Sequence, residues 1–211
     1  IAGSGAELLI VQNTATNSAT SRIFLVPTGS AKTVQLRGLT ITGGNVDFSG
    51  GGGLSIGSGS NAIVSITGCA IRGNSALAGT GGAGIRQSSG TLTIVNSTIS
   101  NNAVLGTIGG SSGIYSTGGA SLAVINSTIS GNTINGPGST MVGGIMTSTP
   151  TTVRNCTITN NGGVGTTGVF ASNTLTISNS IIAGNVNNTT VPDVSGGFTS
   201  NGANLIGNVG T

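Results

Sequence analysis

Short segments in which apolar and polar residues alternate recur along the whole chain. In LAVINSTISGN, at residues 122–132, Leu122 and Val124 alternate with small or polar residues, and the pattern resumes at Ile129 after Asn126. A period of two is typical of β-strands, because successive side chains point to opposite faces of a strand. The segment therefore predicts two short strands that are joined at a polar corner.

Five other segments repeat this pattern, so the chain consists of structural repeats. Aligned on the apolar residue of the second strand, the copies give an isoleucine column that we expect to face the interior: Ile41, Ile71, Ile99, Ile129, Ile158 and Ile182. Neighbouring members of the column are 30, 28, 30, 29 and 24 residues apart. This regular period is typical of a solenoid, in which each repeat forms one coil on top of the previous one.

A Gly-rich arm precedes the repeats and contributes another short apolar segment, as in GGGLSIGSG at 51–59 and SGIYSTGG at 112–119. We expect a further strand in each arm. The chain therefore predicts an all-β fold, a right-handed single-stranded parallel β-helix (β-solenoid) of about seven coils with three strands per coil. The right hand follows from the strong preference of parallel crossover connections for that hand.

The uninterrupted repeats predict a single domain over residues 1–211. It has an incomplete first coil at 1–33, regular coils at 34–188 and a last coil at 189–211. Both ends carry strand-like sequence with no helix or charged repeat that would cap a solenoid. We therefore expect head-to-tail self-association into a filament or surface layer. The alternative is that flanking segments of a longer chain cover the ends.

Asparagine recurs at two places in the coils. The first asparagine column lies at the corner between two strands, where glycine stands at 38 and 68, and consists of Asn96, Asn126, Asn155 and Asn179. The second asparagine column lies just past the isoleucine strand and consists of Asn74, Asn102, Asn132, Asn161 and Asn185. Asparagine tolerates a left-handed backbone, and stacked amides can hydrogen-bond to one another. We expect both columns to be structural ladders at the corners.

The composition argues against several classes of function. Charged residues form 4% of the chain, the net charge is +3 and histidine is absent. Because the only acids are Glu7, Asp47 and Asp193, we expect neither the paired carboxylates of a glycosidase nor a metal site. We predict that the protein is not an enzyme and has no catalytic residue, metal or cofactor. The scattered cations and the short apolar runs predict no nucleic-acid partner and no membrane span.

Cys69 and Cys156 occupy the same place in their repeats, where other copies have serine. Their coils are three apart, or about 14 Å at the usual strand spacing, which is too far for a disulfide between them. We interpret them as small buried thiols, and an intermolecular bridge stays open as the alternative.

One outward-facing column of the arms is a candidate interface or ligand-binding stripe. It consists of Arg86, Tyr115, Met146 and Phe170, preceded by Ser55. An apolar contact surface for a neighbouring subunit fits this stripe, and so does a row of aromatic rings that stack on sugar rings.

The N-S-T-I-S-G-N repeats with G-G-I-Y-like arms resemble bacterial secreted right-handed parallel β-helix proteins of the pectin-lyase-like superfamily. The first and last segments are similar to large surface and extracellular proteins with polymorphic-membrane-protein-like repeats and variable C-terminal anchors. This resemblance implies an extracellular or bacterial cell-surface location and an adhesive or structural role. We therefore expect a non-enzymatic structural protein, and the alternative is an adhesin module that binds cell-surface glycans.

Overall fold

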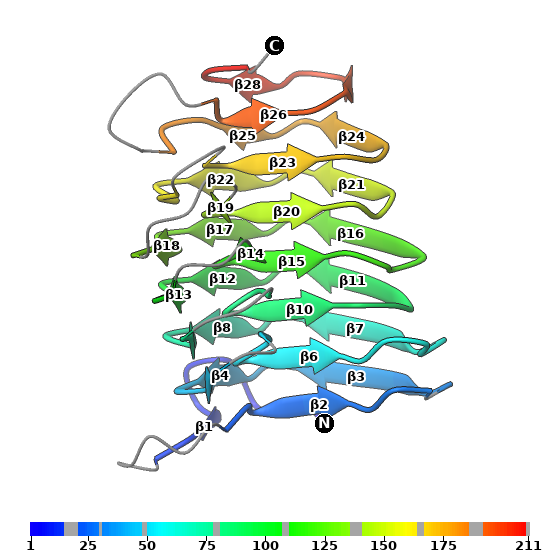
Figure 1. Ribbon diagram of the computed structural model, residues 1–211, viewed down its shortest axis with the longest axis vertical. Helices are drawn as coiled ribbons and strands as arrows, with labels where there is room; N and C mark the ends of the chain where they lie inside the picture. The colour runs from blue at the N-terminus through cyan, green and yellow to red at the C-terminus, as the bar shows by residue number, and fades with distance from the viewer. Residues whose placement is uncertain are drawn as a thin grey trace.

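The strands of this protein stack into a single column that rises from the N-terminal coil to the C-terminal coil (Figure 1). The computed structural model describes residues 1–14, 21–29, 31–47, 50–77, 81–106, 110–135, 141–163, 167–185 and 192–209. Within these residues the named elements are all strands, and the pairings between strands of successive coils are parallel. The predicted class, an all-β parallel β-helix, is confirmed.

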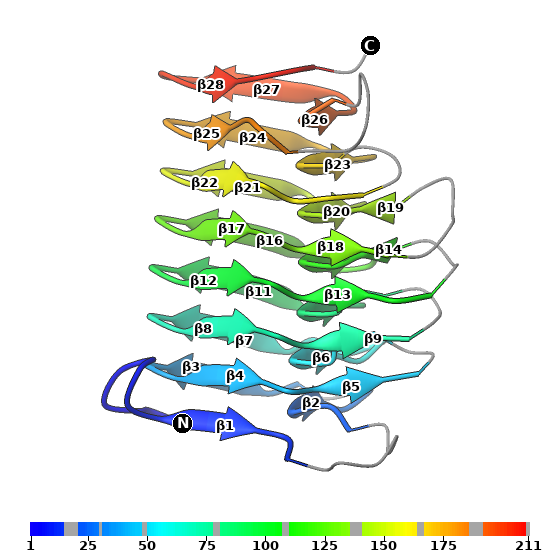
Figure 2. The ribbon, with the colours of Figure 1, turned by 90° about the vertical axis from the view of Figure 1, so that its left-hand side faces the viewer.

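The isoleucine sheet carries the column that the repeats define, and it has eight strands. Their order is β1 (Ile10–Gln12), β4 (Thr40–Thr42), β8 (Ala70–Arg72), β12 (Thr98–Ser100), β17 (Thr128–Ser130), β22 (Thr157–Thr159), β25 (Ile181–Ile182) and β28 (Leu205–Ile206). Figure 2 looks onto the side of the column where this sheet lies. Each strand places its central or final isoleucine or valine inward, beside its counterpart in the next coil.

The Gly-rich arms form a second sheet of seven strands, the arm sheet. Its order is β2 (Phe24–Val26), β6 (Leu54–Ile56), β10 (Ile85–Gln87), β15 (Ile114–Ser116), β20 (Ile145–Thr147), β23 (Val169–Ala171) and β26 (Val194–Ser195). The inward residues Ile85, Ile114 and Ile145 are in register with one another. Figure 1 shows this sheet in front, with its strands one above another.

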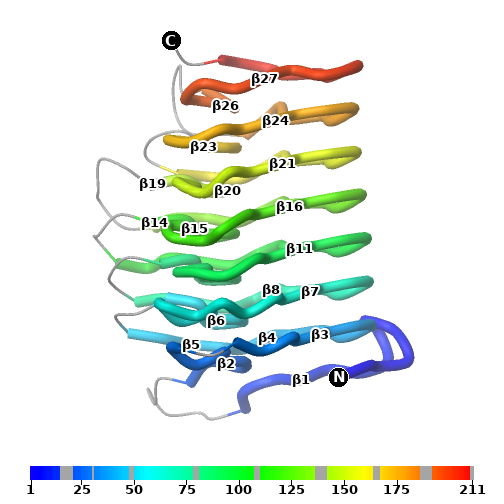
Figure 3. The backbone as a smooth tube through the Cα atoms, turned by 90° about the vertical axis from the view of Figure 1, so that its right-hand side faces the viewer, coloured from blue at the N-terminus to red at the C-terminus, as the bar shows by residue number. Residues whose placement is uncertain are grey.

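The third sheet, here the long-strand sheet, also has seven strands. From the lower to the upper end these are β3 (Thr33–Arg37), β7 (Ile63–Thr67), β11 (Thr91–Val95), β16 (Ser121–Ile125), β21 (Thr151–Arg154), β24 (Leu175–Ser178) and β27 (Phe198–Asn201). The tube in Figure 3 shows that its coils run as near-parallel layers. Strict alternation of buried and partly exposed residues, as in β11, is the pattern that the sequence predicts for a half-buried strand.

The structure adds short strands that the prediction of three strands per coil left out. A four-stranded sheet consists of β5 (Asn45–Val46), β9 (Ser75–Ala76), β13 (Ala103–Val104) and β18 (Thr133–Ile134). A two-stranded sheet consists of β14 (Gly110–Ser111) and β19 (Met141–Val142). Val46, Ala76, Val104 and Ala83 form a small apolar cluster of their own beneath the four-stranded sheet. Two residues are too few to show a period in sequence, so pattern analysis missed these strands.

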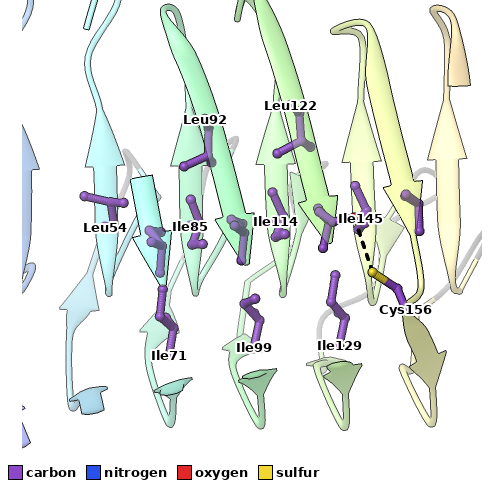
Figure 4. Close-up of a cluster of buried hydrophobic side chains, with 14 of the residues drawn as sticks. Leu54, Ile71, Ile85, Leu92, Ile99, Ile114, Leu122, Ile129, Ile145 and Cys156 are labelled. Carbon is purple, nitrogen blue, oxygen red and sulfur yellow. Dashed lines mark hydrogen bonds between the residues drawn. The ribbon is translucent and has the colours of Figure 1, made fainter. Parts of the chain in front are cut away.

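The core is a set of apolar columns that run along the axis of the solenoid. All six members of the isoleucine column have no exposed surface. Leu54, Ile85 and Ile114 from the arm sheet meet them from the opposite side, and Leu92 and Leu122 of the long-strand sheet close the interior (Figure 4). Burying a side chain of this size contributes about 1.5–3 kcal/mol relative to leaving it exposed, so every coil contributes to the stability of its neighbours.

The first asparagine column provides the backbone conformation of a corner. Its members have φ between 48° at Asn126 and 53° at Asn155, and Gly38 and Gly68 take the same position with φ of 60°. The asparagine side chains are exposed. One amide-to-amide bond joins the column within the described residues, from Asn155 Nδ2 to Asn126 Oδ1 at 2.9 Å. The corner therefore depends on left-handed φ values, and the continuous amide ladder expected here is absent from the described column.

The second asparagine column is buried and forms a continuous ladder. Asn102 donates from both its backbone N and its Nδ2 to Oδ1 of Asn132, at 3.1 and 2.9 Å. Asn132 bonds in the same two ways to Oδ1 of Asn161, at 3.2 and 2.9 Å. Its Nδ2 also lies 3.0 Å from the carbonyl oxygen of Ile99, in the coil below. Each amide therefore ties together three successive coils.

The ladder continues in both directions. Asn74 bonds to Asn102 below the middle coils, and Asn161 bonds to Asn185 above them, with the same pair of donors. The left-handed residue of this corner is the one before the asparagine, as at Gly131 with φ of 64°. The sequence prediction gave the asparagine a turn-backbone role, whereas the structure gives that role to its predecessor. Because the preceding residue adopts the left-handed φ, the asparagine itself is free of that constraint and its side chain can point inward.

The ladder predicts different effects for asparagines of the two columns. Replacing Asn132 with alanine removes the acceptor of two buried Asn102 donors, so we expect the free energy of unfolding to fall by about 2–4 kcal/mol. Replacing Asn126 with glycine keeps the left-handed corner, so the free energy of unfolding should change by less than about 1 kcal/mol. Urea unfolding followed by circular dichroism measures both variants. Equal losses in the two variants would contradict the structural role of the ladder.

Candidate functional site

The outward stripe predicted from the arms lies along the outer face of the arm sheet. Arg86 is in register with Tyr115, Tyr115 with Met146, and Met146 with Phe170. All four side chains are half-buried. Strands of neighbouring coils are about 4.8 Å apart, so each side chain covers part of the next one. The structure therefore brings the predicted residues together, with the charged end toward the N-terminal coils and the apolar end toward the C-terminal coils.

A groove of about 560 Å³ opens at the charged end of this stripe. We call it the arginine groove. Its walls include Arg22, which precedes β2, and Arg86 of β10, together with the hydroxyl-bearing residues Ser55 and Ser88. The Arg86 Nε donates a hydrogen bond to Ser88 Oγ at 3.0 Å. That contact is one of the interactions that hold the Arg86 side chain beside the groove.

The two arginines of the groove affect each other electrostatically. Burial lowers the pKa of Arg22 from its ordinary value, and the positive charge of Arg86 lowers it further. Arg22 also reaches the carbonyl oxygen of Gly50, with its Nη2 at 3.5 Å. Sequence reasoning missed Arg22 because it lies in the first coil, outside the regular repeats. Aligning Phe24–Val26 with Leu54–Ile56 would have placed it beside the arm sheet.

The three acidic residues lie on different segments of the chain. Glu7 is exposed in the turn before β1, Asp47 is half-buried just after β5, and Asp193 lies immediately before β26. Across the part of the chain that the structure describes, no three residues of the types His, Cys, Asp and Glu gather where they could hold a metal ion. None of the three acids lies within a paired strand, so no strand register places two of them opposite each other.

Asp193 completes the buried asparagine ladder at its upper end. Its Oδ1 accepts hydrogen bonds from the backbone N and the Nδ2 of Asn185, at 2.8 and 2.7 Å. Its Oδ2 accepts a third bond from the backbone N of Asn208 at 3.0 Å. A carboxylate accepts without donating, so it can end a chain of amides in which each oxygen receives donors from below. Asp193 follows Asn185 by eight residues rather than by one repeat, so no periodicity identified it.

Both cysteines occupy the slot that serine fills in other coils. Cys69 and Cys156 are buried and free. The backbone N of Cys69 donates to Ser97 Oγ at 3.1 Å, and that of Cys156 donates to Ser180 Oγ at 3.1 Å. Figure 4 shows the Cys156 sulfur pointing into the interior. Burial raises the pKa of both thiols, which keeps them in the less reactive protonated form.

The ends of the column differ from one sheet to another. Residues 1–3 lie against β3, where Gly3 N donates to the Arg37 carbonyl at 2.7 Å. At the other end, Asp193 N donates to the Asn208 carbonyl at 2.8 Å, so a terminal segment covers β26. Each of these two sheets is therefore covered at one end. The isoleucine sheet begins at β1 and finishes at β28, with no further paired strand among the described residues.

Large apolar side chains lie on the outer face of the isoleucine sheet at its two ends. Ile10 of β1 is 48% exposed, and Ile181 and Leu205 near the other end are 46% and 60% exposed. The strands between them carry smaller residues at the corresponding position: threonine in β12, β17 and β22, alanine in β8, and a buried threonine in β4. The surface therefore changes from polar in the middle to apolar at both open edges.

These features define a parallel β-solenoid whose coils are held by stacked side chains. A family model for a right-handed β-helix region matches residues 28–210. The chain therefore belongs to the right-handed β-helix family, and the predicted hand is confirmed. Comparison with curated proteins and with solved structures gives no match. Within the residues that the structure describes, no helix has the length and apolar character that crossing a membrane requires.

Proposed function

We propose that this β-helix is a non-enzymatic structural module that associates end to end through the isoleucine sheet. The observation that carries the proposal is that β1 and β28 have no further paired strand among the described residues and carry exposed apolar side chains. An open strand edge presents unpaired backbone donors and acceptors that can pair with another chain. The exposed Ile10 and Leu205 supply apolar surface that such pairing would bury.

The register within the chain defines how two copies would meet. Ile181 pairs with Leu205 and Ile182 with Ile206 at the upper end, while Val11 pairs with Ile41 at the lower end. A second copy that continues this register places its β1 on β28, with Leu205 beside Ile10 and Ile206 beside Val11. The two surfaces differ, so the contact is heterologous and builds an open filament. Flanking segments of a longer chain would cover the same edges without association, and the experiment below separates these cases.

An adhesin that binds cell-surface glycans is the second candidate function. The half-buried Tyr115 and Phe170 on the arm sheet favour it, because aromatic faces stack on sugar rings. Both candidates suit an extracellular or bacterial cell-surface protein, a location that the resemblance to secreted pectin-lyase-like β-helix proteins supports. We favour end-to-end association because it would bury the exposed apolar residues at both edge strands of the isoleucine sheet, β1 and β28.

Variants of the two edges test end-to-end association. We expect wild-type protein to show concentration-dependent association in sedimentation velocity and elongated particles in electron microscopy. Ile10→Lys and Leu205→Lys should each reduce the association at least tenfold, because a buried unpaired charge opposes the contact. The matched control Thr98→Lys introduces the same charge in the middle of the same sheet and should associate like wild type.

A mixture of the two edge variants gives the sharper result. The Ile10→Lys variant keeps an intact β28 edge, and the Leu205→Lys variant keeps an intact β1 edge. These two intact edges can pair with each other, and because both outer edges of the resulting dimer carry lysine, growth should stop at dimers. Monomeric wild-type protein at all concentrations would contradict the proposal and favour flanking segments as the cover. Association that survives both substitutions would show that another surface is responsible.

The non-enzymatic part of the proposal predicts no turnover of acidic or neutral polysaccharides. Pectin, alginate and similar polymers should release neither reducing ends nor unsaturated products, because no strand register pairs two of the three acids. Reducing-end and ultraviolet absorbance assays measure the two kinds of product. Release by purified wild-type protein would disprove this part of the proposal, and loss of that release in an Asp47→Asn variant would identify the acid involved.

A further inference from the structure

Residues 4–8 form an extra turn at the corner of the first coil (Figure 2). In the next coils the long strand and the isoleucine strand are joined by two residues, as between β7 and β8. In the first coil the chain turns outward instead, and Leu8 N donates to the Gly5 carbonyl oxygen at 3.0 Å. Thr40 Oγ1, on the outer face of β4, donates to the carbonyl oxygen of Ala6. The turn therefore lies against the outer face of the isoleucine sheet at β4.

A hollow lies beside this turn because the next coil carries small residues on its outer face. Ala70 of β8 pairs with Thr40 on one side and with Thr98 of β12 on the other. At the corner of the same coil, Gly68 stands where the following coil has Asn96. The hollow has a volume of about 420 Å³. We call it the corner groove: Gly68 and Ala70 form its floor, the turn lies on one side, and β12 with the corner before it lies on the other.

The corner groove carries one acidic and one basic side chain. Glu7 lines it from the turn, and Arg72 lines it from the last position of β8. Both side chains are exposed, and neither has an ion pair or a hydrogen bond to another residue in the described part of the chain. A carboxylate only accepts hydrogen bonds, and a guanidinium group only donates them. The groove therefore offers an acceptor and a donor of opposite charge to a ligand.

These two charges select a ligand that carries both signs. An ammonium group fits the Glu7 carboxylate, and a carboxylate fits the paired N–H donors of Arg72. A neutral sugar would lack the Coulomb attraction to both groups. Among the described residues no aromatic ring lines the groove, so a sugar ring would also have nothing to stack on. We propose that the corner groove binds a small α-amino acid as its zwitterion, with the ammonium group on Glu7 and the carboxylate on Arg72.

The rest of the lining suits a ligand of this size. Asn96, Thr98 and Ser100 supply uncharged donors and acceptors beside the two charges. Ala6 and Ala70 add small apolar surface, which favours a short aliphatic side chain on the ligand. The strands β4 and β12 are two strand spacings apart, or about 9.6 Å, which leaves room for a small amino acid between the turn and β12. The groove lies on the outer face of the sheet and does not depend on end-to-end association.

Titration with L-alanine, followed through backbone amide chemical shifts in NMR, tests the site. We expect saturable shifts at Gly68, Ala70 and Thr98, which surround the groove. Two further probes each remove one charge from the ligand: N-acetylalanine lacks the ammonium group, and alaninamide lacks the carboxylate. Each should bind about tenfold more weakly than L-alanine, because each loses one hydrogen-bonded charge pair.

Variants of the two charged residues assign each ligand group to its partner. Glu7→Gln should weaken L-alanine binding about tenfold, but it should not weaken N-acetylalanine, which has no ammonium group. Arg72→Gln should weaken L-alanine binding by a similar factor, but it should not weaken alaninamide, which has no carboxylate. The control Arg154→Gln removes a charge from an exposed position on the long-strand sheet and should bind L-alanine as wild type does. Because Glu7 and Arg72 are exposed, we expect both variants to keep the fold, and melting curves check this.

Every other outcome decides against the proposal. Absence of L-alanine binding in wild type would overturn the site directly, and equal affinities for L-alanine and glucose would contradict selection by charge. Ala70→Leu fills the floor of the groove and keeps both charges, so it should weaken L-alanine binding, and unchanged binding would place the amino acid elsewhere. Unchanged binding in Glu7→Gln and Arg72→Gln would exclude the two charges as its partners. Carrying out the titrations in the Leu205→Lys background keeps this test separate from end-to-end association.

Discussion

The pairing of buried asparagine amides with the next coil is the constraint on which the rest of the structure depends. An unpaired amide inside an apolar column would cost several kcal/mol, so a coil can stack only where its asparagine meets the one above. In the middle of the ladder each Oδ1 accepts two hydrogen bonds from the asparagine of the coil below, and each Nδ2 donates to a carbonyl oxygen of that coil. This holds for Asn102, Asn132 and Asn161. No buried side-chain nitrogen or oxygen lacks a partner in the described part of the chain. The ladder therefore sets the register that the apolar columns then fill.

Close packing around the ladder explains why particular residues must be small. A Cβ added to Gly84 would lie 3.0 Å from Asn102 Nδ2 and 2.8 Å from the Gly113 carbonyl oxygen. A side chain there would push the arm sheet away from the ladder and break the amide contacts. The ladder therefore decides which positions of successive coils pair, while the apolar interior supplies most of the stabilisation through burial. The apolar edges and the arginine groove lie on the outer surface.

Much of the fold could be predicted from sequence because each coil repeats the same local rules. Alternation around Ile129 identifies strands, and its recurrence identifies a solenoid, since identical environments select similar residues in every coil. Features that occur once leave no such signal. Asp193 ends the ladder outside the repeat period, and Arg22 enters the groove from the irregular first coil. The roles of the two asparagine columns were also inseparable by residue type, because only tertiary packing decides which amide is buried.

The central claim is that one asparagine column carries a continuous hydrogen-bonded ladder through the interior, whereas the other sets the left-handed backbone of an exposed corner. Hydrogen exchange of assigned side-chain amides, followed by NMR, tests it directly. We expect the Nδ2 protons of Asn102, Asn132 and Asn161 to exchange at least a hundredfold more slowly than those of Asn96 and Asn126, since opening the ladder requires separating coils. Similar fast exchange in both columns would contradict the account, because it would mean that the buried amides are not held between coils.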